Sequence, residues 1–189
     1  DNDILLVFDE VVTGFRLAYG GAQAYYGVEP DICTLGKAIG GGFPLAAVAG
    51  REEVMACFDS AQTEAERFVP QVGTLSGNPV AAAAGVATLA VLRQSGTYER
   101  FFETCNVLLN GLRERIARHG IEAVVVGEPP MFDVVFAPGE VRNYRDTLRG
   151  DAAKLDRMNA LLWERGILKA ATKYYLSTSL TEVDVEQTL

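Results

Sequence analysis

The sequence has a single histidine, His119, and only three cysteines, which lie far apart and form no CxxC pair. A Ser-His-Asp triad needs a suitably placed histidine, and a Cys/His zinc site needs closely spaced ligands, so neither is supported. An odd number of cysteines also argues against a disulfide framework. We therefore expect no metal site, and we expect Cys33, Cys57 and Cys105 to be free thiols in the reducing cytoplasm.

The sequence also has fewer basic than acidic residues. The chain has 17 Lys and Arg against 25 Asp and Glu, which gives a formal net charge of −8, and it has no dense basic cluster. Because a nucleic-acid-binding surface needs such a cluster, we expect no nucleic-acid partner. The longest apolar stretch, residues 80–92, is too short to span a bilayer, so we expect no membrane partner either, and no secretory signal.

Hydrophobic residues, by contrast, make up 49% of the 189 residues, which is enough for a sizeable core. In the first half, short apolar runs alternate with helical patterns, and this predicts an α/β fold with parallel strands. The apolar run 4–8 is expected to be a strand buried on both faces. Because this run follows residue 1 so closely and the chain begins without Met, we expect an upstream part of the protein. The other expected elements of this half are strands at 31–35 and 45–49, helices at 21–26 and 51–58, a glycine turn at 40–42 and a loop at 60–72.

Asn78 and Pro79 predict the start of a helix, because Asn is a good cap and Pro fits the first helical position. This helix extends to about Arg93 and is apolar on nearly all sides, so we expect it to be buried. We place a domain boundary between residues 95 and 96, so that residues 1–95 and 96–189 form separate domains. The second domain is expected to contain helices at 97–119, at 151–165 and after the cap Thr181, and strands at 121–126, 131–136, 167–168 and 174–178.

Two charged residues, Asp9 and Lys37, stand at the ends of apolar strands. In open parallel sheets, ligands bind beyond the carboxyl ends of the strands, so neighbouring strands would direct this carboxylate and this amine into one crevice. A lysine in such a place can be a nucleophile that forms a Schiff base. That chemistry requires a carboxylate that keeps a pyridine nitrogen protonated, and Asp9 meets this need.

Simpler interpretations compete with this one. Asp9 and Lys37 can form a salt bridge at a sheet edge, and their spacing alone does not decide between the two readings. The pair Gly36-Lys37 also resembles the end of a nucleotide phosphate loop. However, residue 38 is Ala rather than Ser or Thr, and Asp31 stands where the first glycine is needed, so a nucleotide site is disfavoured. His119 ends a helix and is expected to be a cap or a surface residue.

Three motifs carry a resemblance to a known family: LVFDEVVTGFR at residues 6–16, PDICTLGKAIGGGFP at residues 30–44, and GTLSGNP at residues 73–79. In this order and at these separations they closely resemble the class III pyridoxal-phosphate-dependent aminotransferases, in the branch of glutamate-1-semialdehyde 2,1-aminomutase. A weaker similarity continues through residues 141–144 to the C-terminus. The resemblance implies the fold type I of pyridoxal-phosphate-dependent transferases. Residues 1–95 would be the C-terminal part of the large parallel-sheet domain, and residues 96–189 a small α+β domain.

The resemblance also assigns roles to four residues. Lys37 would form the Schiff base with pyridoxal 5'-phosphate and later move a proton between substrate and cofactor. Asp9 would bind the pyridinium nitrogen, and Val11 would pack on the ring face. Thr74 would reach the cofactor phosphate of the neighbouring subunit, which makes a homodimer part of the site, with a local turn hydrogen bond as its alternative role. Glu10 and Arg16 belong to the motif, and we expect an internal ion pair for them.

In this family the phosphate loop, the aromatic residue stacked on the cofactor and much of the substrate pocket come from the upstream half of the chain. We therefore expect these 189 residues alone to be an incomplete enzyme. Residues 169–181 depart from the Pro-Ser, Glu and His-Thr residues typical of the aminomutase branch, which leaves the small-molecule amino donor and acceptor open. An amino-acid racemase and a non-catalytic dimerising fragment stand as alternatives to the aminotransferase or aminomutase.

Overall fold

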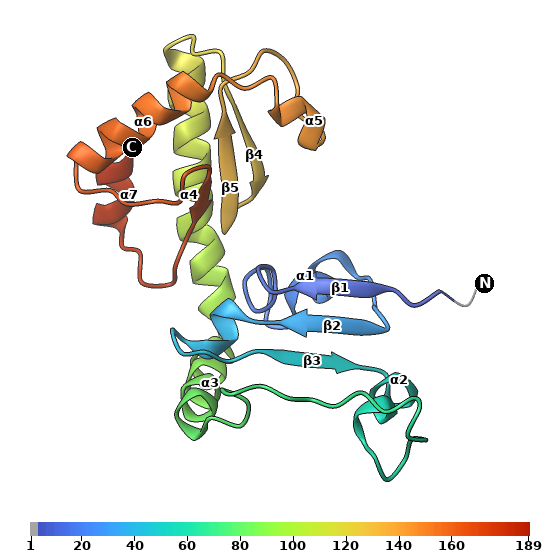
Figure 1. The fold of residues 1–189 in the computed structure, drawn as a ribbon. Helices are drawn as coiled ribbons and strands as arrows, with labels where there is room; N and C mark the ends of the chain where they lie inside the picture. The colour runs from blue at the N-terminus through green and yellow to red at the C-terminus, as the bar shows by residue number, and fades with distance from the viewer. Residues whose placement is uncertain (1–3) are drawn as a thin grey trace. The chain divides into compact units, whose positions relative to one another are not determined.

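The structure, a computed structural model, describes residues 4–189, and its contacts divide the chain into two compact units. The first unit ends at Tyr98, and the second covers Glu99–Leu189. Each unit contains a three-stranded sheet (Figure 1). The domain boundary between residues 95 and 96 stays a prediction. Among the described residues, no helix combines the length and the apolar character needed to cross a membrane.

The sheet of the first unit is built around a parallel pair of strands. β1 (Val7–Glu10) runs parallel to β2 (Ile32–Leu35), and α1 (Gly21–Tyr26) lies in the connection between them, as the sequence predicted. β3 (Ala47–Gly50) pairs with β2 in the antiparallel direction, so the strand order is β1-β2-β3. The predicted helix at 51–58 is divided into α2 (Glu52–Met55) and the 3-10 helix η2 (Ala56–Phe58).

The first strand differs from its prediction. The expected strand at residues 4–8 was to be buried on both faces, whereas β1 begins at Val7 and ends at Glu10. Ile4 is 80% exposed and Val7 is 54% exposed. β1 pairs only with β2 and is an edge of the described sheet, which explains this exposure. As a result, Asp9 lies within the strand, one residue before its end.

Glu10, the last residue of β1, ties this strand to α1. Its side chain is fully buried. Its carboxylate accepts hydrogen bonds from the backbone N–H groups of Ala22 and Gln23, both at 2.9 Å, and from the hydroxyl of Thr13. Gly21 makes room for it, because a Cβ at that position would lie 2.6 Å from Oε1 of Glu10. The expected ion pair of Glu10 is therefore wrong within residues 4–189: the amides of a helix start, rather than a cation, compensate the buried charge.

The glycine run expected as a turn follows a 3-10 helix, η1 (Lys37–Gly40), that packs against α3 (Pro79–Leu92). Gly41 ends η1 with a φ of +54°. A Cβ at this position would collide with the hydroxyl of Thr88 on α3, so both the backbone angle and the close approach require glycine. The packing of η1 on α3 thereby fixes the turn that carries Lys37.

α3 begins as predicted but is not buried as predicted. Oδ1 of Asn78 accepts hydrogen bonds from two N–H groups of the first turn, at 2.9 and 3.2 Å, and Pro79 follows it. Of this helix only Ala81 and Gly85 are buried, whereas Val80, Val86 and Val91 are between 53% and 70% exposed. A helix that is apolar all round needs partners on every side, and η1 covers only part of it within the first unit.

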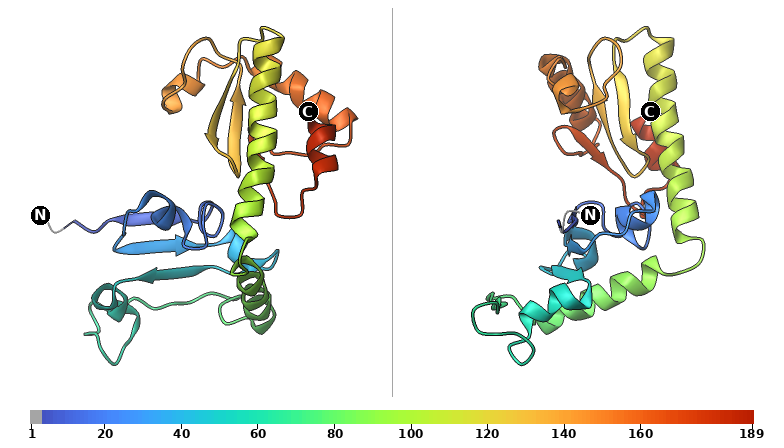
Figure 2. Two further views of the ribbon diagram at one scale, coloured as in Figure 1. Left: turned by 180° about the vertical axis from the view of Figure 1, so that it is seen from behind. Right: turned by 90° about the vertical axis from the view of Figure 1, so that its right-hand side faces the viewer.

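In the second unit, α4 (Thr97–Arg118) covers one face of an antiparallel sheet (Figure 2). β4 (Val124–Glu128) and β5 (Met131–Val135) form a hairpin, and β6 (Lys173–Tyr175) pairs with β5. Within the described residues no strand forms at 167–168, and β6 is shorter than the expected strand at 174–178. The core between helix and sheet consists mainly of Phe101, Cys105, Leu108, Leu109, Val125, Phe132, Val134 and Tyr174.

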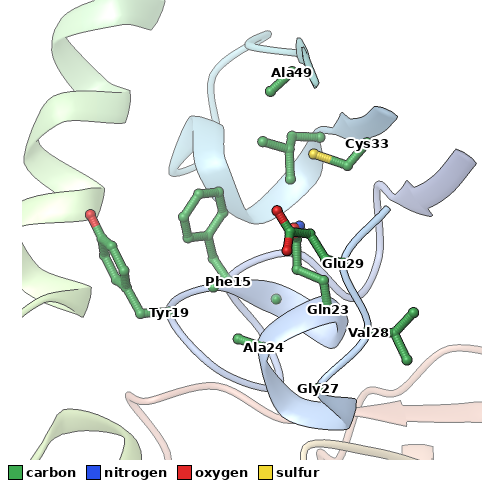
Figure 3. Close-up of a pocket in the computed structure, with 13 residues that line it drawn as sticks. Phe15, Tyr19, Gln23, Ala24, Gly27, Val28, Glu29, Cys33 and Ala49 are labelled. Atoms are coloured by element: carbon green, nitrogen blue, oxygen red, sulfur yellow. The ribbon is translucent and has the colours of Figure 1, made fainter. Parts of the chain in front are cut away.

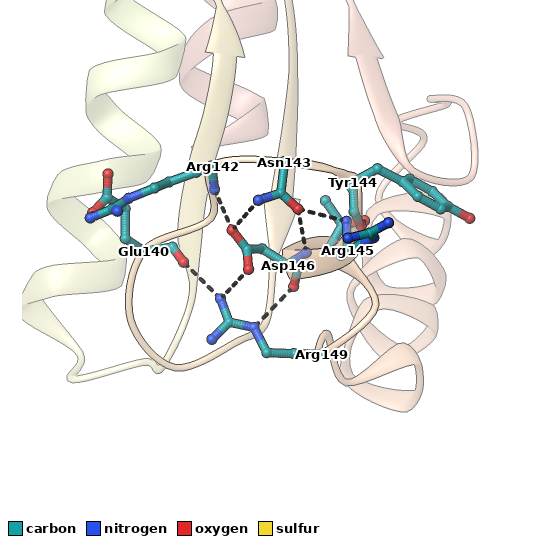
Figure 4. Close-up of polar contacts among 8 residues, drawn as sticks. Glu140, Arg142, Asn143, Tyr144, Arg145, Asp146 and Arg149 are labelled. Atoms are coloured by element: carbon teal, nitrogen blue, oxygen red, sulfur yellow. Dashed lines mark hydrogen bonds and ion pairs between the residues drawn. The ribbon is translucent and has the colours of Figure 1, made fainter.

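The segment that continues the family resemblance, residues 141–144, leads into a polar network around α5 (Tyr144–Thr147) (Figure 4). Oδ1 of Asn143 accepts hydrogen bonds from N–H groups at the start of α5, at 2.9 and 3.3 Å. Asp146 accepts the N–H of Arg142 at 2.9 Å and pairs with Arg149 at 3.3 Å. These contacts close a surface loop, so this segment has a structural explanation. Beyond it lie α6 (Ala152–Glu164) and α7 (Glu182–Thr188), capped by Asp151 and, as expected, Thr181.

The core of the second unit leads to a prediction about Phe132. This side chain is 1% exposed and stacks on Tyr174 with ring centroids 4.9 Å apart. Replacing it by alanine (Phe132→Ala) should lower the free energy of unfolding by about 3–5 kcal/mol, because it leaves a cavity in the core. Urea denaturation followed by circular dichroism measures this loss. Leu168→Ala is the control: Leu168 is 77% exposed, and a loss there as large as at Phe132 would contradict the assigned core.

Glu10 gives a pH-dependent prediction. Burial on its own raises the pKa of Glu10, but the donors from Thr13, Ala22 and Gln23 outweigh it and hold the pKa below its ordinary value of 4.5. A depressed pKa stabilises the folded state fully above the ordinary value, and this stabilisation is lost as pH falls through the folded pKa. Glu10→Gln should therefore lower the free energy of unfolding at pH 7 by about 1–3 kcal/mol.

The difference between wild type and Glu10→Gln should shrink as pH falls below 4.5, when measured by urea unfolding over a pH series. Glu66→Gln is the matched control, because Glu66 is exposed. It should change stability by no more than about 0.5 kcal/mol at any pH. A Glu10→Gln penalty that stays constant down to acidic pH would show that the carboxylate charge is not what the amides stabilise.

Candidate functional site

Asp9 lies on an exposed face of β1, and two donors hold one of its oxygens. In the parallel register Asp9 is directly opposite Thr34 of β2, so the two side chains share a face of the sheet. The hydroxyl of Thr34 donates to Oδ1 at 3.3 Å, and the N–H of Val11 donates to the same oxygen at 3.0 Å. Within residues 4–189, Oδ2 accepts no hydrogen bond and no cation pairs with Asp9. The second oxygen is therefore open to a donor from a ligand.

Lys37 begins η1, two residues after the end of β2, and is exposed. Its φ is +47°, in the left-handed region that residues other than glycine rarely adopt. Such a conformation costs free energy and persists only where the surrounding structure imposes it. The packing of η1 on α3 holds the turn that begins with Lys37 at the carboxyl end of β2.

Lys37 also differs from the other lysines of the chain, which has four in total. Nζ of Lys169 donates to three backbone carbonyls, Nζ of Lys173 pairs with Asp133, and Nζ of Lys154 lies 3.8 Å from Asp151. Lys37 forms no hydrogen bond or ion pair within the described part of the chain. The alternative salt bridge between Asp9 and Lys37 is thus absent there, and this amine is available for chemistry.

Val11 brings the two strand ends together. A Cβ at Gly36 would lie 3.4 Å from Cγ1 of Val11, so Gly36 and Val11 are in van der Waals contact range. Gly36 directly precedes Lys37, and Val11 is two residues beyond Asp9. Neighbouring strands lie about 4.8 Å apart. Asp9, Val11 and Lys37 are therefore gathered at the carboxyl ends of β1 and β2, as the parallel pattern predicted.

Thr74 is not linked to this group by any contact of the described residues. It lies exposed in a turn where the N–H of Ser76 donates to the carbonyl of Gly73 at 3.0 Å. The hydroxyl of Thr74 makes no hydrogen bond within residues 4–189, so the local turn bond considered as its alternative role is absent there. The side chain is free to contact a group outside the chain.

Thr34 is the residue of this site that the sequence reasoning did not single out. The pairing of the strands reveals this residue. Asp9 and Thr34 are each one residue before the end of their strand, and parallel strands that end together place such residues side by side. The signal is visible only once the bounds of β1 are known. Because the expected strand at 4–8 ended before Asp9, the sequence did not predict the pairing of Asp9 with Thr34.

A separate pocket of about 690 Å³ lies on the other face of the same sheet (Figure 3). Its lining includes Phe15, Gln23, Cys33 and Leu35. Side chains alternate between faces along a strand, so Cys33 and Leu35 point away from the face that carries Thr34 and Asp9. Neither Asp9 nor Lys37 lines this pocket, and it is not part of the candidate site.

Comparisons with known proteins agree with this geometry. The family model of the class-III aminotransferases matches residues 1–134. A glutamate-1-semialdehyde 2,1-aminomutase from Desulforudis audaxviator is 44% identical over 188 residues, which are 98% of this chain and 42% of that protein. The chain thus spans about two fifths of the length of this relative.

Two solved structures share the fold. An omega-transaminase from Sphaerobacter thermophilus is 31% identical with a TM-score of 0.84, and the match covers 97% of this chain and 42% of that one. A lysine-to-alanine variant of a glutamate-1-semialdehyde aminomutase from Pseudomonas aeruginosa, in complex with PMP, is 25% identical with a TM-score of 0.80. That match covers 98% of this chain and 42% of that one. The expected α/β transferase fold is confirmed, and with more than two thirds of its residues matched by the family model, the chain belongs to the class-III aminotransferase family.

Proposed function

We propose that this chain carries the lysine and the ring-nitrogen carboxylate of an enzyme that transfers an amino group with pyridoxal 5'-phosphate. The observation that carries the proposal is the pairing of β1 and β2. It sets Oδ2 of Asp9 and Nζ of Lys37, which both lack a partner within residues 4–189, at the carboxyl ends of neighbouring parallel strands. When bound, the cofactor supplies an aldehyde and an electron-withdrawing pyridine ring.

The residues present fit this group. A pyridine nitrogen that carries a proton is a donor, and Oδ2 of Asp9 is an acceptor without a partner within residues 4–189. An aldehyde needs an amine nucleophile, and Nζ of Lys37 is the one lysine amine without a partner in that range. The half-buried side chain of Val11, beside Gly36, offers an apolar surface between the two. In addition, the related aminomutase from Pseudomonas aeruginosa holds PMP.

Each residue then has a definite task. Nζ of Lys37 would be the nucleophile toward the cofactor aldehyde, with water as the leaving group, and in transfer this amine would carry a proton to and from the substrate carbon. Oδ2 of Asp9 accepts the hydrogen bond of the ring N–H and keeps that proton in place. Val11 packs on the ring face and excludes water from it.

Partners and compartment follow from the same proposal. We propose a homodimer in which the exposed hydroxyl of Thr74 binds the cofactor phosphate of the neighbouring subunit, because it has no partner within residues 4–189. The two domains, residues 1–95 and 96–189, would be the C-terminal part of the large domain and the small domain of the family. The three cysteines are free thiols, which supports the cytoplasm as the compartment.

The comparisons favour amino-group transfer over the alternatives. The relatives named above are a transaminase and two aminomutases, and none is a racemase or a non-catalytic protein. Small-molecule amino donors and acceptors are therefore the proposed substrates. Residues 169–181, where the sequence departs from the pattern expected for the aminomutase branch, contain two lysines, and Nζ of Lys169 donates to three backbone carbonyls there.

The proposal predicts covalent capture of the cofactor by Lys37. In the full-length protein, borohydride treatment after incubation with pyridoxal 5'-phosphate should fix the cofactor to Lys37, as detected by peptide mass spectrometry. Lys37→Ala should abolish the label and lower amino transfer by at least about a thousand-fold, since it removes both nucleophile and proton carrier. Lys154→Ala, at an exposed lysine, is the matched control and should leave both unchanged. Label on Lys154 or Lys169 instead of Lys37 would overturn the assignment.

A second prediction concerns Asp9. Asp9→Asn keeps the shape of the side chain but removes the charge that holds the ring proton. Labelling of Lys37 should persist, because the aldehyde is unaffected, whereas the rate of transfer should fall by about a hundred-fold or more. Glu29→Gln, at an exposed carboxylate on the far side of the sheet, serves as the control. A transfer rate in Asp9→Asn equal to that of wild type would exclude Asp9 from the site.

A further inference from the structure

We propose that Thr34 is a positioning residue that aims the carboxylate of Asp9, an inference that rests on the proposed function. Neither the motif nor the comparisons assign a role to Thr34. Its hydroxyl donates to Oδ1 of Asp9 across the parallel pair, at 3.3 Å. Because it contacts Asp9 rather than a ligand, it would act through that residue.

The two donors on Asp9 converge on one oxygen. The N–H of Val11 reaches Oδ1 from the chain that follows Asp9, and the Thr34 hydroxyl reaches it from the neighbouring strand. Two donors from different directions fix the plane of the carboxylate, whereas one donor leaves it free to rotate. Oδ1 thus accepts two hydrogen bonds. Oδ2 accepts none within residues 4–189, so both lone pairs of Oδ2 are free for the ring N–H.

Among the described residues, the other strand partner of Thr34 offers its hydroxyl no side-chain acceptor. On its other side Thr34 lies opposite Val48 of β3, whose side chain cannot accept a hydrogen bond. Threonine and valine have nearly the same shape and both favour strands, so the strand does not itself require a hydroxyl at this position. The hydrogen bond to Asp9 is a contact that threonine makes and valine could not.

Two forms of the cofactor separate positioning from a structural role. Pyridoxal 5'-phosphate has the ring nitrogen, and its 1-deaza analogue has a C–H group there but keeps the aldehyde and the phosphate. Aiming Oδ2 matters only for the ligand with a ring N–H. In the full-length protein, Thr34→Val should weaken binding of pyridoxal 5'-phosphate by about five-fold, measured by equilibrium dialysis. Binding of the analogue should stay within about two-fold of wild type.

The conservative variant and a matched control complete the test. Thr34→Ser keeps the hydroxyl and should bind both ligands as wild type does. Thr104→Val makes the same chemical change on α4, where the hydroxyl donates to the carbonyl of Arg100, and should affect neither ligand. Thermal unfolding of each variant reports on the fold independently of binding.

The outcomes are distinct. An equal loss for both ligands in Thr34→Val, or a Thr34→Ser variant as impaired as Thr34→Val, would overturn positioning and leave a structural role. Unchanged binding of pyridoxal 5'-phosphate in Thr34→Val would also overturn it. If borohydride fixes no cofactor to Lys37 in the wild type, the proposed function fails and this inference fails with it. If Lys37 is labelled while Thr34→Val behaves as wild type, only the inference about Thr34 fails.

Discussion

The parallel pairing of β1 with β2 is the constraint on which the candidate site depends. Parallel strands that end together bring their carboxyl ends to one edge, and here that edge receives Asp9 and Val11 from one strand and Lys37 from the other. A shift of the register by one residue would turn every side chain of β1 to the opposite face. It would then direct Glu10 toward the ligand face and turn Asp9 toward the amides of α1 that now bind Glu10. The chemistry therefore depends on a backbone hydrogen-bond pattern before it depends on any functional group.

Because of this strand pairing, two adjacent carboxylates differ: Glu10 has a structural role, and Asp9 is the candidate functional residue. Glu10 is fully buried and satisfied by the first turn of α1, whereas Asp9, one residue earlier, is exposed and keeps one oxygen without a partner among the described residues. The alternation of the strand gives them opposite faces, and their surroundings give them opposite tasks. Glu10 holds the end of β1 against α1, and this fixes the strand that presents Asp9. On the other strand, the close approach of η1 to α3 at Gly41 does the same for Lys37.

Sequence reasoning located the parts that depend on local signals. The Asn78 cap, the Thr181 cap and the crossover around α1 were all predictable, because each relies on residues close together in the chain. It also selected Asp9 and Lys37 as residues at strand ends.

Sequence reasoning failed where the answer depends on neighbours in space. The bounds of β1 follow from its pairing with β2, the acceptor contacts of Glu10 come from residues twelve and thirteen positions away, and the exposure of α3 depends on which elements cover it. Thr34 was missed for the same reason, since only the register reveals its contact.

The contacts of the four lysines support the proposal that Lys37 carries the chemistry. An amine that serves as a nucleophile has to be free of hydrogen bonds that would hold its lone pair or its charge elsewhere. In the second unit, Lys169 is fixed by three carbonyls over the ring of Tyr174, and Lys173 is paired with Asp133. Lys169 holds exposed carbonyls of the loop before β6, and Lys173 neutralises the partly buried carboxylate of Asp133 in the sheet. Lys37 has no such contact within residues 4–189, and its backbone has a positive φ in the turn where η1 packs on α3. A side chain without contacts to the described fold, on a backbone in a costly conformation, supports the proposed task of Lys37 toward a ligand.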